Sequence, residues 1–198
     1  MAAPTMACTQ IASSILRNCD KPLVTGLEET IYLLPFDDVD KTLSTLDATN
    51  KQLLTNLVMK AAKTGYKVEG IQFSNDHDTA LVKGKYVDAF EHNLMFRIFD
   101  ISEVTKQWIM QLLNTRVIVV IGNKVSSGNE AAKYEVLGWE LGLELMEMTR
   151  NQNDADTKGG YVLKIACDDT NKEPKLPLTF FKTDAATTKA AVEALVTA

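Results

Sequence analysis

The stretch YEVLGWELGLELMEMTR, residues 134–150, alternates large apolar residues with glycine or glutamate over most of its length. A period of two is typical of a β-strand with one buried face. A helix would spread the leucines over more than one face, and its two interior glycines would each cost about 1 kcal/mol. The pattern therefore predicts one long strand, whose glycines allow another backbone to approach closely. Its predicted apolar face holds Leu137, Trp139, Leu141, Leu143 and Leu145.

A second alternating stretch follows a polar connection. Tyr161, Leu163, Ile165 and Cys167 alternate with residues that include Lys164, and the connection TRNQNDADTKGG ends in two glycines. Two alternating runs joined in this way indicate a long β-hairpin. Two substitutions test which face of this hairpin is buried. Leu141→Arg should abolish folding, whereas Glu144→Lys should leave the fold intact.

Further strands are predicted on both sides of the chain centre. The segments TIYLL (30–34), YKVEGIQFS (66–74) and RVIVVIGN (116–123) are strand-like, and SNDHD (74–78) has the composition of a turn. One or two long strands are expected within 79–100. The assignment of residues 41–64 stays open between helix and strands or loops. One face of the long strand holds Phe90, His92, Leu94, Phe96 and Ile98, and the other holds Glu91, Asn93 and Arg97 with Met95 among them.

Two segments show helical rather than strand periodicity. SEVTKQWIMQLL has a predicted core face of Val104, Trp108, Ile109 and Leu112, and either Asp100 or Ser102 is placed to cap its N-terminus. TDAATTKAAVEALVTA predicts a short closing helix, with Thr183 or Asp184 as its cap. One central amphipathic helix in a strand-rich chain predicts a mainly β or α+β fold.

Composition limits the class of protein. The 198 residues suit one domain at 21–198 after a small, polar N-terminal arm at 1–20, and 45% hydrophobic residues are enough for a core. The net charge is −5 and no basic stripe is present, which argues against a protein that grips nucleic acid. The N-terminus lacks signal-peptide features, and no run approaches the ~20 apolar residues that span a bilayer. Synthesis in the cytosol, without a membrane partner, is therefore expected.

Candidate chemical motifs are better explained without chemistry. The loop NQNDADTKGG has Ala155 where a calcium ligand would belong, and NDHD (75–78) and FDDVD (36–40) fit polar turns. His92 is expected to be buried and hydrogen-bonded, and Cys167 to be a small core residue. The three cysteines form no CxxC pair, and no hydrolase, protease or nucleotide-binding motif is present. We therefore expect no enzyme activity, no metal and no cofactor.

One polar face has two readings. The even-numbered positions of residues 134–145 present Glu140 and Glu144, with Glu147 nearby. In a monomer they would face water. In a closed ring of strands the same face would line a channel with negative charge, and a DNA duplex would pass without sticking.

The order of these elements resembles the tail tube (major tail) proteins of long-tailed bacteriophages. The resemblance covers about residues 20–198. It rests on residue patterns and on short sequence segments, without one diagnostic motif. It is carried by YKVEGIQFSND, KGKYVDAFEHNLMFRIFD, SEVTKQWIMQLL, RVIVVIGN, YEVLGWELGLELMEMTRNQNDADTKGGYVLKIAC and EPKLPLTFFKTDAATTKAAVEAL. The arm through Asp20 and the segment 41–64 depart from it.

The resemblance implies a fold and a function. The fold would be two antiparallel sheets in a barrel-like sandwich, flanked by the helix SEVTKQWIMQLL and closed by the C-terminal helix. Protomers would form hexameric rings that stack into a tube conducting DNA, in the virion tail after assembly in the host cytoplasm. The implied partners are further copies of the chain, other tail proteins and transiting DNA. Contacts between rings or subunits are expected in the loop that contains Arg150, Asn153, Asp154, Asp156 and Lys158.

Two alternatives remain at this point. One is a neck, tail-terminator or portal-adjacent protein, which would form a single ring and stop. The other, from a different class, is a cytosolic β-rich binding or enzymatic domain that uses the NDHD or FDDVD acids. A tube protein should form rings or filaments without a ligand, whereas the melting temperature of a metal-dependent domain should change with a chelator.

Overall fold

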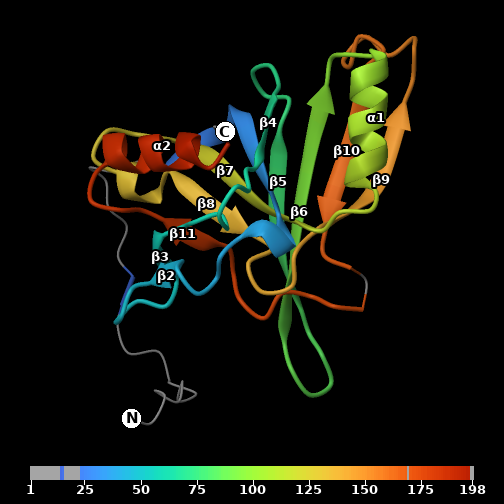
Figure 1. Ribbon diagram of the computed structural model, residues 1–198. Coiled ribbons are helices and arrows are strands. Elements are labelled where there is room, and N and C mark those ends of the chain that lie inside the picture. Colours follow the sequence, from blue (N-terminus) through green and yellow to red (C-terminus); the bar gives the residue numbers. More distant parts are fainter. Residues whose placement is uncertain (1–13, 16–22, 169, 197–198) are drawn as a thin grey trace.

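The computed structural model describes residues 14–15, 23–168 and 170–196 (Figure 1). Within these residues the chain forms two β-sheets and two α-helices, in agreement with the mainly β, α+β prediction. The predicted arm at 1–20 falls almost entirely outside the described residues, as do Cys8 and Cys19. No helix among the described residues is long and apolar enough to cross a membrane.

The larger sheet has seven strands in the order β2-β3-β11-β8-β7-β1-β4. All its pairings are antiparallel except that of β3 with β11, which is parallel. The strands are β1 (Leu23–Pro35), β2 (Thr45–Leu46), β3 (Leu53–Asn56), β4 (Tyr66–Glu69), β7 (Val117–Val125), β8 (Tyr134–Leu137) and β11 (Leu178–Phe180). Short 3₁₀ turns, η1 (Phe36–Asp38) and η2 (Glu130–Ala132), follow β1 and precede β8.

The smaller sheet is antiparallel throughout, in the order β5-β6-β10-β9. Its strands are β5 (Asp76–Val82), β6 (Ala89–Ile98), β9 (Glu144–Arg150) and β10 (Tyr161–Ala166). The two sheets are not closed into a barrel, so only the coarser prediction of a mixed sandwich holds for the single chain.

The core is divided into two clusters by the larger sheet. One cluster lies between the sheets and includes Leu94 and Phe96 of β6, Leu163 of β10 and Val119 of β7. The other lies on the far side of the larger sheet, where the C-terminal helix α2 (Ala185–Ala194) covers it with Val192. The layers are therefore the small sheet, a first core, the large sheet, a second core and α2 (Figure 1).

The prediction of one long strand over 134–145 is wrong. The chain leaves the large sheet after β8 and enters the small sheet at β9, so the residues between them form a crossover turn. Gly138 and Gly142 have φ values of 67° and 83°, which favour glycine and end the strand. A Cβ on Gly138 would lie 2.6 Å from Cγ of Leu143, and a Cβ on Gly142 would lie 2.9 Å from the Phe36 ring. The predicted hairpin itself is confirmed, since β9 pairs with β10.

The turn also changes which leucines are buried. Leu137 and Leu143 are fully buried, but Leu141 is 37% exposed and does not belong to the apolar face assigned to it. Apolar and polar residues continue to alternate in the sequence through the turn. The backbone there is not an extended strand, so the alternation does not place the residues on two opposite faces. The expectation that Leu141→Arg abolishes folding is therefore not supported by its exposure.

Both helices occur where the sequence predicts them. In α1 (Glu103–Leu112) the Ser102 side chain accepts a hydrogen bond from the N–H of Thr105, and in α2 the cap is Asp184. Ile109 and Leu112 are buried and Trp108 packs against the first core. Val104 is 75% exposed, so its assignment to the core face is wrong. At 100° per residue it lies about 90° from the centre of the buried face.

Other strand predictions are corrected or completed by the structure. The predicted strand at 66–74 ends at Glu69, and the predicted turn at 74–78 instead contains the first residues of β5. The long strands expected in 79–100 are confirmed as part of β5 and as β6, joined by an exposed hairpin at 83–88. The segment left open at 41–64 forms β2, β3 and a single bridge between Val39 and Met59.

Candidate functional surface of the small sheet

The small sheet has one face toward the first core and one face away from it. The register of its strands assigns each residue to a face, because directly opposed residues share a side. Leu94, Phe96, Leu163 and Ile165 define the core side. The opposite side, called here the outer face, holds Asp76, Asp78, Ala80 and Val82 of β5, Glu91, Asn93, Met95 and Arg97 of β6, Val162, Lys164 and Ala166 of β10, and Glu144, Glu147 and Thr149 of β9.

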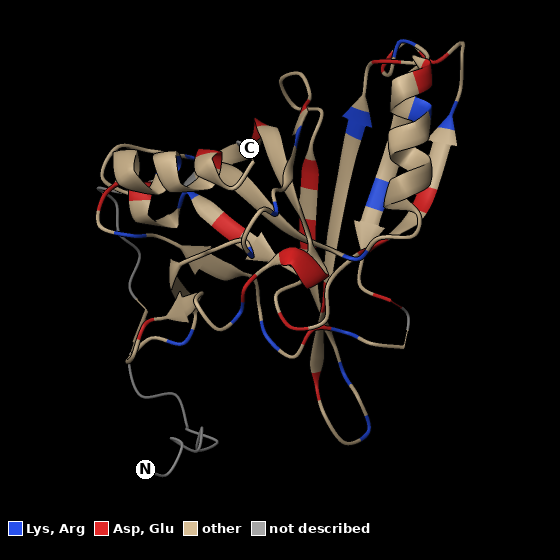
Figure 2. Cartoon of the chain, in the orientation of Figure 1, with Lys and Arg blue, Asp and Glu red and all other residues tan. Residues whose placement is uncertain are grey.

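The outer face is acidic. It carries five carboxylates, on Asp76, Asp78, Glu91, Glu144 and Glu147, against two cations, on Arg97 and Lys164, for a formal charge of −3. Four of the acidic residues lie on the edge strands β5 and β9 and the fifth, Glu91, lies on β6, while the two basic residues lie on β6 and β10 (Figure 2). Polar chemistry on this face is therefore unevenly distributed, with the negative charge toward its two edges.

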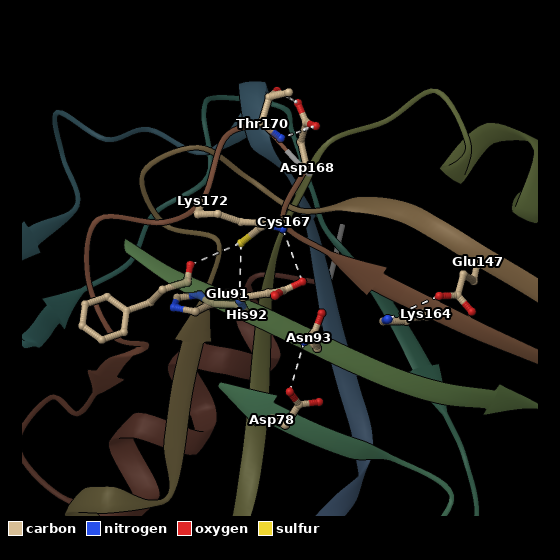
Figure 3. A network of polar contacts seen from close by, with 11 residues as sticks. Asp78, Glu91, His92, Asn93, Glu147, Lys164, Cys167, Asp168, Thr170 and Lys172 are labelled. Carbon is tan, nitrogen blue, oxygen red and sulfur yellow. Dashed lines mark hydrogen bonds and ion pairs between the residues drawn. The ribbon is translucent and has the colours of Figure 1, made fainter. Parts of the chain in front are cut away.

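Short polar contacts order several of these side chains. Lys164 Nζ lies 3.3 Å from Glu147 Oε1, and the Asn93 side-chain amide donates to Asp78 Oδ2 at 3.0 Å (Figure 3). Lys172, which follows β10, lies 3.3 Å from Glu91 Oε1. Each contact joins partners on this side of the sheet, and Glu144 is left as an exposed carboxylate near the β9 edge.

The three glutamates predicted for one face do not share it. Glu140 lies in the crossover turn, where its carboxylate is 2.6 Å from Lys175 Nζ, so its assignment beside Glu144 is corrected. Glu144 and Glu147 do lie on the outer face, although three residues apart they would point to opposite sides of a regular strand. A bulge between Glu147 and Leu145 in the pairing with β10 restores them to one side.

Asp76, Asp78 and Glu91 were not predicted as members of the acidic face, although Glu91 was correctly placed on the polar face of its own strand. The first two were assigned to a turn because Asn, Asp and His are typical turn residues. In the structure the strand alternation separates them, so Asp76 and Asp78 point to the outer face and His77 to the core side. The NDHD residues therefore do not converge. Among the described residues, no group of three or more His, Cys, Asp or Glu is placed to hold a metal ion.

The loop between β9 and β10 is held by its own hydrogen bonds. Asp154 accepts from the N–H of Asp156 and from the hydroxyl of Thr157, and these bonds lower the pKa of its carboxyl group. Asn153 donates its N–H to the Asn151 side chain. Arg150 Nε donates to the carbonyl oxygen of Gly159 at 2.9 Å, and Lys158 adopts a φ of 52°. The loop is therefore an ordered feature, and its predicted role in ring contacts stays a prediction.

Buried polar residues beneath the small sheet are structural. His92 is confirmed as buried and hydrogen-bonded: its Nδ1 accepts from the N–H of Gly138 at 3.2 Å, and its Nε2 donates to the carbonyl oxygen of Lys175 at 3.0 Å. Burial lowers the pKa of His92 to about 4, so the ring is neutral at pH 7. Cys167 is confirmed as a buried core residue, and burial raises the pKa of its thiol.

Charged side chains from distant segments hold the crossover turn. Glu173, only 1% exposed, accepts hydrogen bonds from the N–H groups of Glu140 at 3.1 Å and Leu141 at 2.8 Å. Lys41 Nζ donates to the carbonyl oxygen of Trp139 at 2.6 Å, and Arg116 donates to that of Leu141 at 3.2 Å. Burial raises the pKa of Glu173. No signal in the sequence connects these segments, because the bonded partners lie between 25 and 98 residues apart in the chain.

Among the cavities lined by described residues, two lie beside the helix α1 and between strands of the two sheets. One, of about 350 Å³, lies beside α1 and is lined by Leu33, Tyr66 and Trp108 among others. The other, of about 400 Å³, lies between β1, β5 and β7, and there His77 Nε2 is 4.0 Å from a carboxylate oxygen of Glu135. The acids of FDDVD do not form a paired site: Asp38 binds Lys63, and Asp40 accepts N–H bonds from its own turn.

The edges of the small sheet are its second notable feature. Among the described strands, β5 and β9 each pair on one side only, with β6 and β10 respectively. Each therefore presents unpaired backbone N–H and C=O groups along seven residues. Large apolar side chains are exposed on both strands: Leu81 on β5, and Met146 and Met148 on β9.

Comparison with known proteins adds no further constraint. No protein-family model matches the chain, and neither a curated protein nor a solved structure is significantly similar to it.

Proposed function

We propose that this protein is a structural subunit that assembles into rings, and that the rings stack into a tube of the kind found in the tails of long-tailed bacteriophages. The tube conducts DNA and belongs to the virion, where other tail proteins are its neighbours. The observation that carries the proposal is the antiparallel small sheet with both edges unpaired and an acidic outer face. No catalytic step is part of this function.

The free edges support closure into a ring. Exposed strand edges promote uncontrolled association unless they are paired or covered. The sheet has four strands, an even number, so β9 of one copy runs opposite to β5 of a copy placed beside it in the same orientation. Joining identical copies edge to edge therefore continues the antiparallel order, and a rotation that closes the ring removes every free edge of this sheet.

The size of such a ring suits a conduit. Six copies, the number implied by the resemblance, contribute about 24 strands, more than the 16–18 that leave an aqueous channel in porins. A strand spacing of about 4.8 Å and a tilt of about 40° give roughly 50 Å between opposite backbones. A barrel of this width leaves room for a DNA duplex after side chains fill part of it.

The negative charge of the outer face supports a ring in which this face lines the lumen. The first core covers the other face of the sheet, so the outer face is the side available to line a channel. Repeating a charge of −3 around the ring produces a wall that repels phosphate, and DNA slides along it without tight binding.

The hairpin between β5 and β6 supports stacking of the rings. It projects from the body of the protein (Figure 1), and its tip exposes Tyr86 at 86% and Val87 at 76%. Adjacent exposed apolar side chains on a projecting element suit a contact with another copy. Strand direction places this tip at one end of the proposed barrel.

Electron microscopy of the untagged protein across a concentration series tests the proposal. Rings or stacked tubes with a central hole are expected, without added ligand. Isolated rings that never stack would favour the single-ring alternative, a neck or tail-terminator protein. A monomer that persists at high concentration, even with pre-formed tube fragments added as seeds, would contradict self-assembly and return attention to a β-rich binding or enzymatic domain.

Charge reversal tests the lumen separately. Glu144→Lys together with Glu147→Lys changes the outer face from −3 to +1 per copy, and we expect tubes of this variant to retain duplex DNA at low salt. Co-sedimentation of DNA with tubes measures the effect, which should disappear as salt is raised. The matched control, Asp37→Lys with Glu69→Lys, makes the same change in charge on exposed residues outside this face. Equal DNA retention by both variants would contradict the lumen assignment.

A further inference from the structure

We infer that β5 of one copy pairs antiparallel with β9 of the next copy, with Thr79 opposite Met148 and His77 opposite Arg150. The inference rests on the proposed function and specifies the contact, here called the seam, that closes each ring. It follows from three properties of the single chain: the direction of the free backbone groups, the faces of the two edge strands, and their exposed apolar side chains.

Backbone contacts of β6 show which groups of β5 are free. The N–H of Phe90 donates to the carbonyl oxygen of Glu173 at 2.7 Å, and the N–H of Cys167 donates to that of His92 at 3.3 Å. Even-numbered residues of β6 therefore direct their backbone groups away from β5, and odd-numbered residues such as Asn93 direct theirs toward it. Consistently, the carbonyl oxygen of Asn93 lies 2.8 Å from the His77 ring.

The alternation carries across to the free edge of β5. In an antiparallel pair, opposed residues direct their backbone groups either both toward each other or both away. Asp78 is opposite Asn93, so the backbone groups of Asp78 face β6. Those of its neighbours face the opposite way. The free edge of β5 therefore presents the N–H and C=O groups of His77, Thr79 and Leu81.

The same reasoning locates the free groups of β9. Each even-numbered residue of β6 is opposite an odd-numbered residue of β10, so the odd-numbered residues of β10 bond to β6. The even-numbered residues of β10 face β9, where Lys164 is opposite Glu147. The alternation from Glu147 leaves the backbone groups of Met148 and Arg150 at the free edge.

Side-chain faces agree with the backbone directions. On β5, Thr79 is opposite the buried His92, which places Thr79 on the core side together with His77 and Leu81. On β9, Met148 is opposite the buried Leu163, which places Met148 on the core side as well. Residues with free backbone groups on both strands therefore share one face. A seam between them therefore forms hydrogen bonds without turning either sheet over. The registers that remain possible differ from one another by steps of two residues.

Exposed apolar side chains select among these registers. Leu81 is 53% exposed, Met148 is 48% exposed and Met146 is 39% exposed. With Thr79 opposite Met148, all of β9 overlaps β5 and only Asp76 of β5 extends past it, and Leu81 meets Met146 and Leu145 at the bulge of β9. Leu145 and Met146 count as one position at the bulge. A shift of two residues in one direction then moves Leu81 past the end of β9, and a shift in the other direction moves Met146 past the end of β5. The full overlap buries the most apolar surface.

Cross-linking between separate copies tests the register. Thr79→Cys and Met148→Cys proteins, each also carrying Cys8→Ser and Cys19→Ser, are mixed, assembled and oxidised. Opposed residues in a hydrogen-bonded pair have Cα atoms about 5.5 Å apart, within the range of a disulfide, whereas diagonal neighbours are roughly 7–8 Å apart. Covalent dimers are expected as the main product. The control pair, Thr79→Cys with Arg150→Cys, should yield at least about tenfold less.

Hydrogen exchange of the unsubstituted protein gives a second measurement. The amides of His77, Thr79 and Leu81 are expected to exchange rapidly in dilute protein and to slow about a hundredfold on assembly. Those of Asp78 and Ala80 should already be slow in the monomer, because they bond to β6.

The outcomes separate the seam from the function. Tubes in which these three amides stay fast, or in which the control pair cross-links better, would overturn the seam and leave the tube function standing. Absence of any ring or tube would overturn both. Tubes with slowed amides and dominant cross-links between residues 79 and 148 would establish the seam.

Discussion

Leu143→Arg is expected to prevent folding, whereas Leu141→Arg, two residues earlier, is expected to fold. Leu143 has no exposed surface and packs in the first core, so an arginine there would bury an unpaired charge. The cost exceeds about 5 kcal/mol, comparable to the whole stability of many domains. Leu141 is 37% exposed, and an arginine side chain can follow the surface and keep its charge in water.

Circular dichroism and thermal unfolding of both variants measure this difference. The Leu141→Arg protein should lose about 1 kcal/mol or less and keep its strand signal. Both substitutions introduce the same side chain, at positions two residues apart just before β9, so each is a control for the other. Equal loss of structure in the two variants would contradict the crossover turn and restore a continuous strand across 134–145.

Gly138→Ala is expected to lower the free energy of unfolding by roughly 3 kcal/mol. An alanine at φ 67° costs about 1 kcal/mol or slightly more, and its Cβ would lie 2.6 Å from Cγ and 3.1 Å from the backbone nitrogen of Leu143. Leu143 is buried and its own backbone bonds to Val117, so it cannot move aside cheaply. The turn that sends the chain from one sheet to the other therefore depends on glycine at this position.

Gly128→Ala is the matched control for Gly138→Ala. Gly128 also has a positive φ, 83°, but it lies in an exposed loop. Its substitution should cost only the conformational term, about 1 kcal/mol. Urea unfolding of both variants gives the comparison. A loss at Gly138 no larger than the loss at Gly128 would show that contact with Leu143 does not constrain the turn.

Local patterns predicted the elements that depend on near neighbours in the chain. The amphipathic period located α1 and left two candidates for its N-cap, Asp100 and Ser102, of which the structure shows Ser102. The hairpin of β9 and β10 was recognisable because its strands are adjacent in sequence and both alternate. Val104 shows the limit of this reasoning, since apolar spacing alone placed it on a face that the first core does not reach.

The acidic outer face was only partly predictable. Glu144 and Glu147 were found from the sequence, but their common side depends on a bulge that the sequence does not mark. Asp76 and Asp78 were missed because residues that favour turns can also begin an edge strand, where one side faces water. Glu140 was included wrongly, since the turn removes it from the strand and Lys175 binds it.

The sequence by itself determined the β-rich class, the two helices with two candidate caps each, and the hairpin at the end of the small sheet. Each follows from hydrogen bonding and side-chain periodicity within a few residues. The tertiary structure alone decided that residues 134–137 and 144–150 join different sheets. The decision depends on two glycines with positive φ and on bonds to the turn from Lys41, Arg116 and Glu173, which lie far away in the chain. Alternation continues through the turn in sequence, but only the folded backbone determines where the strand ends.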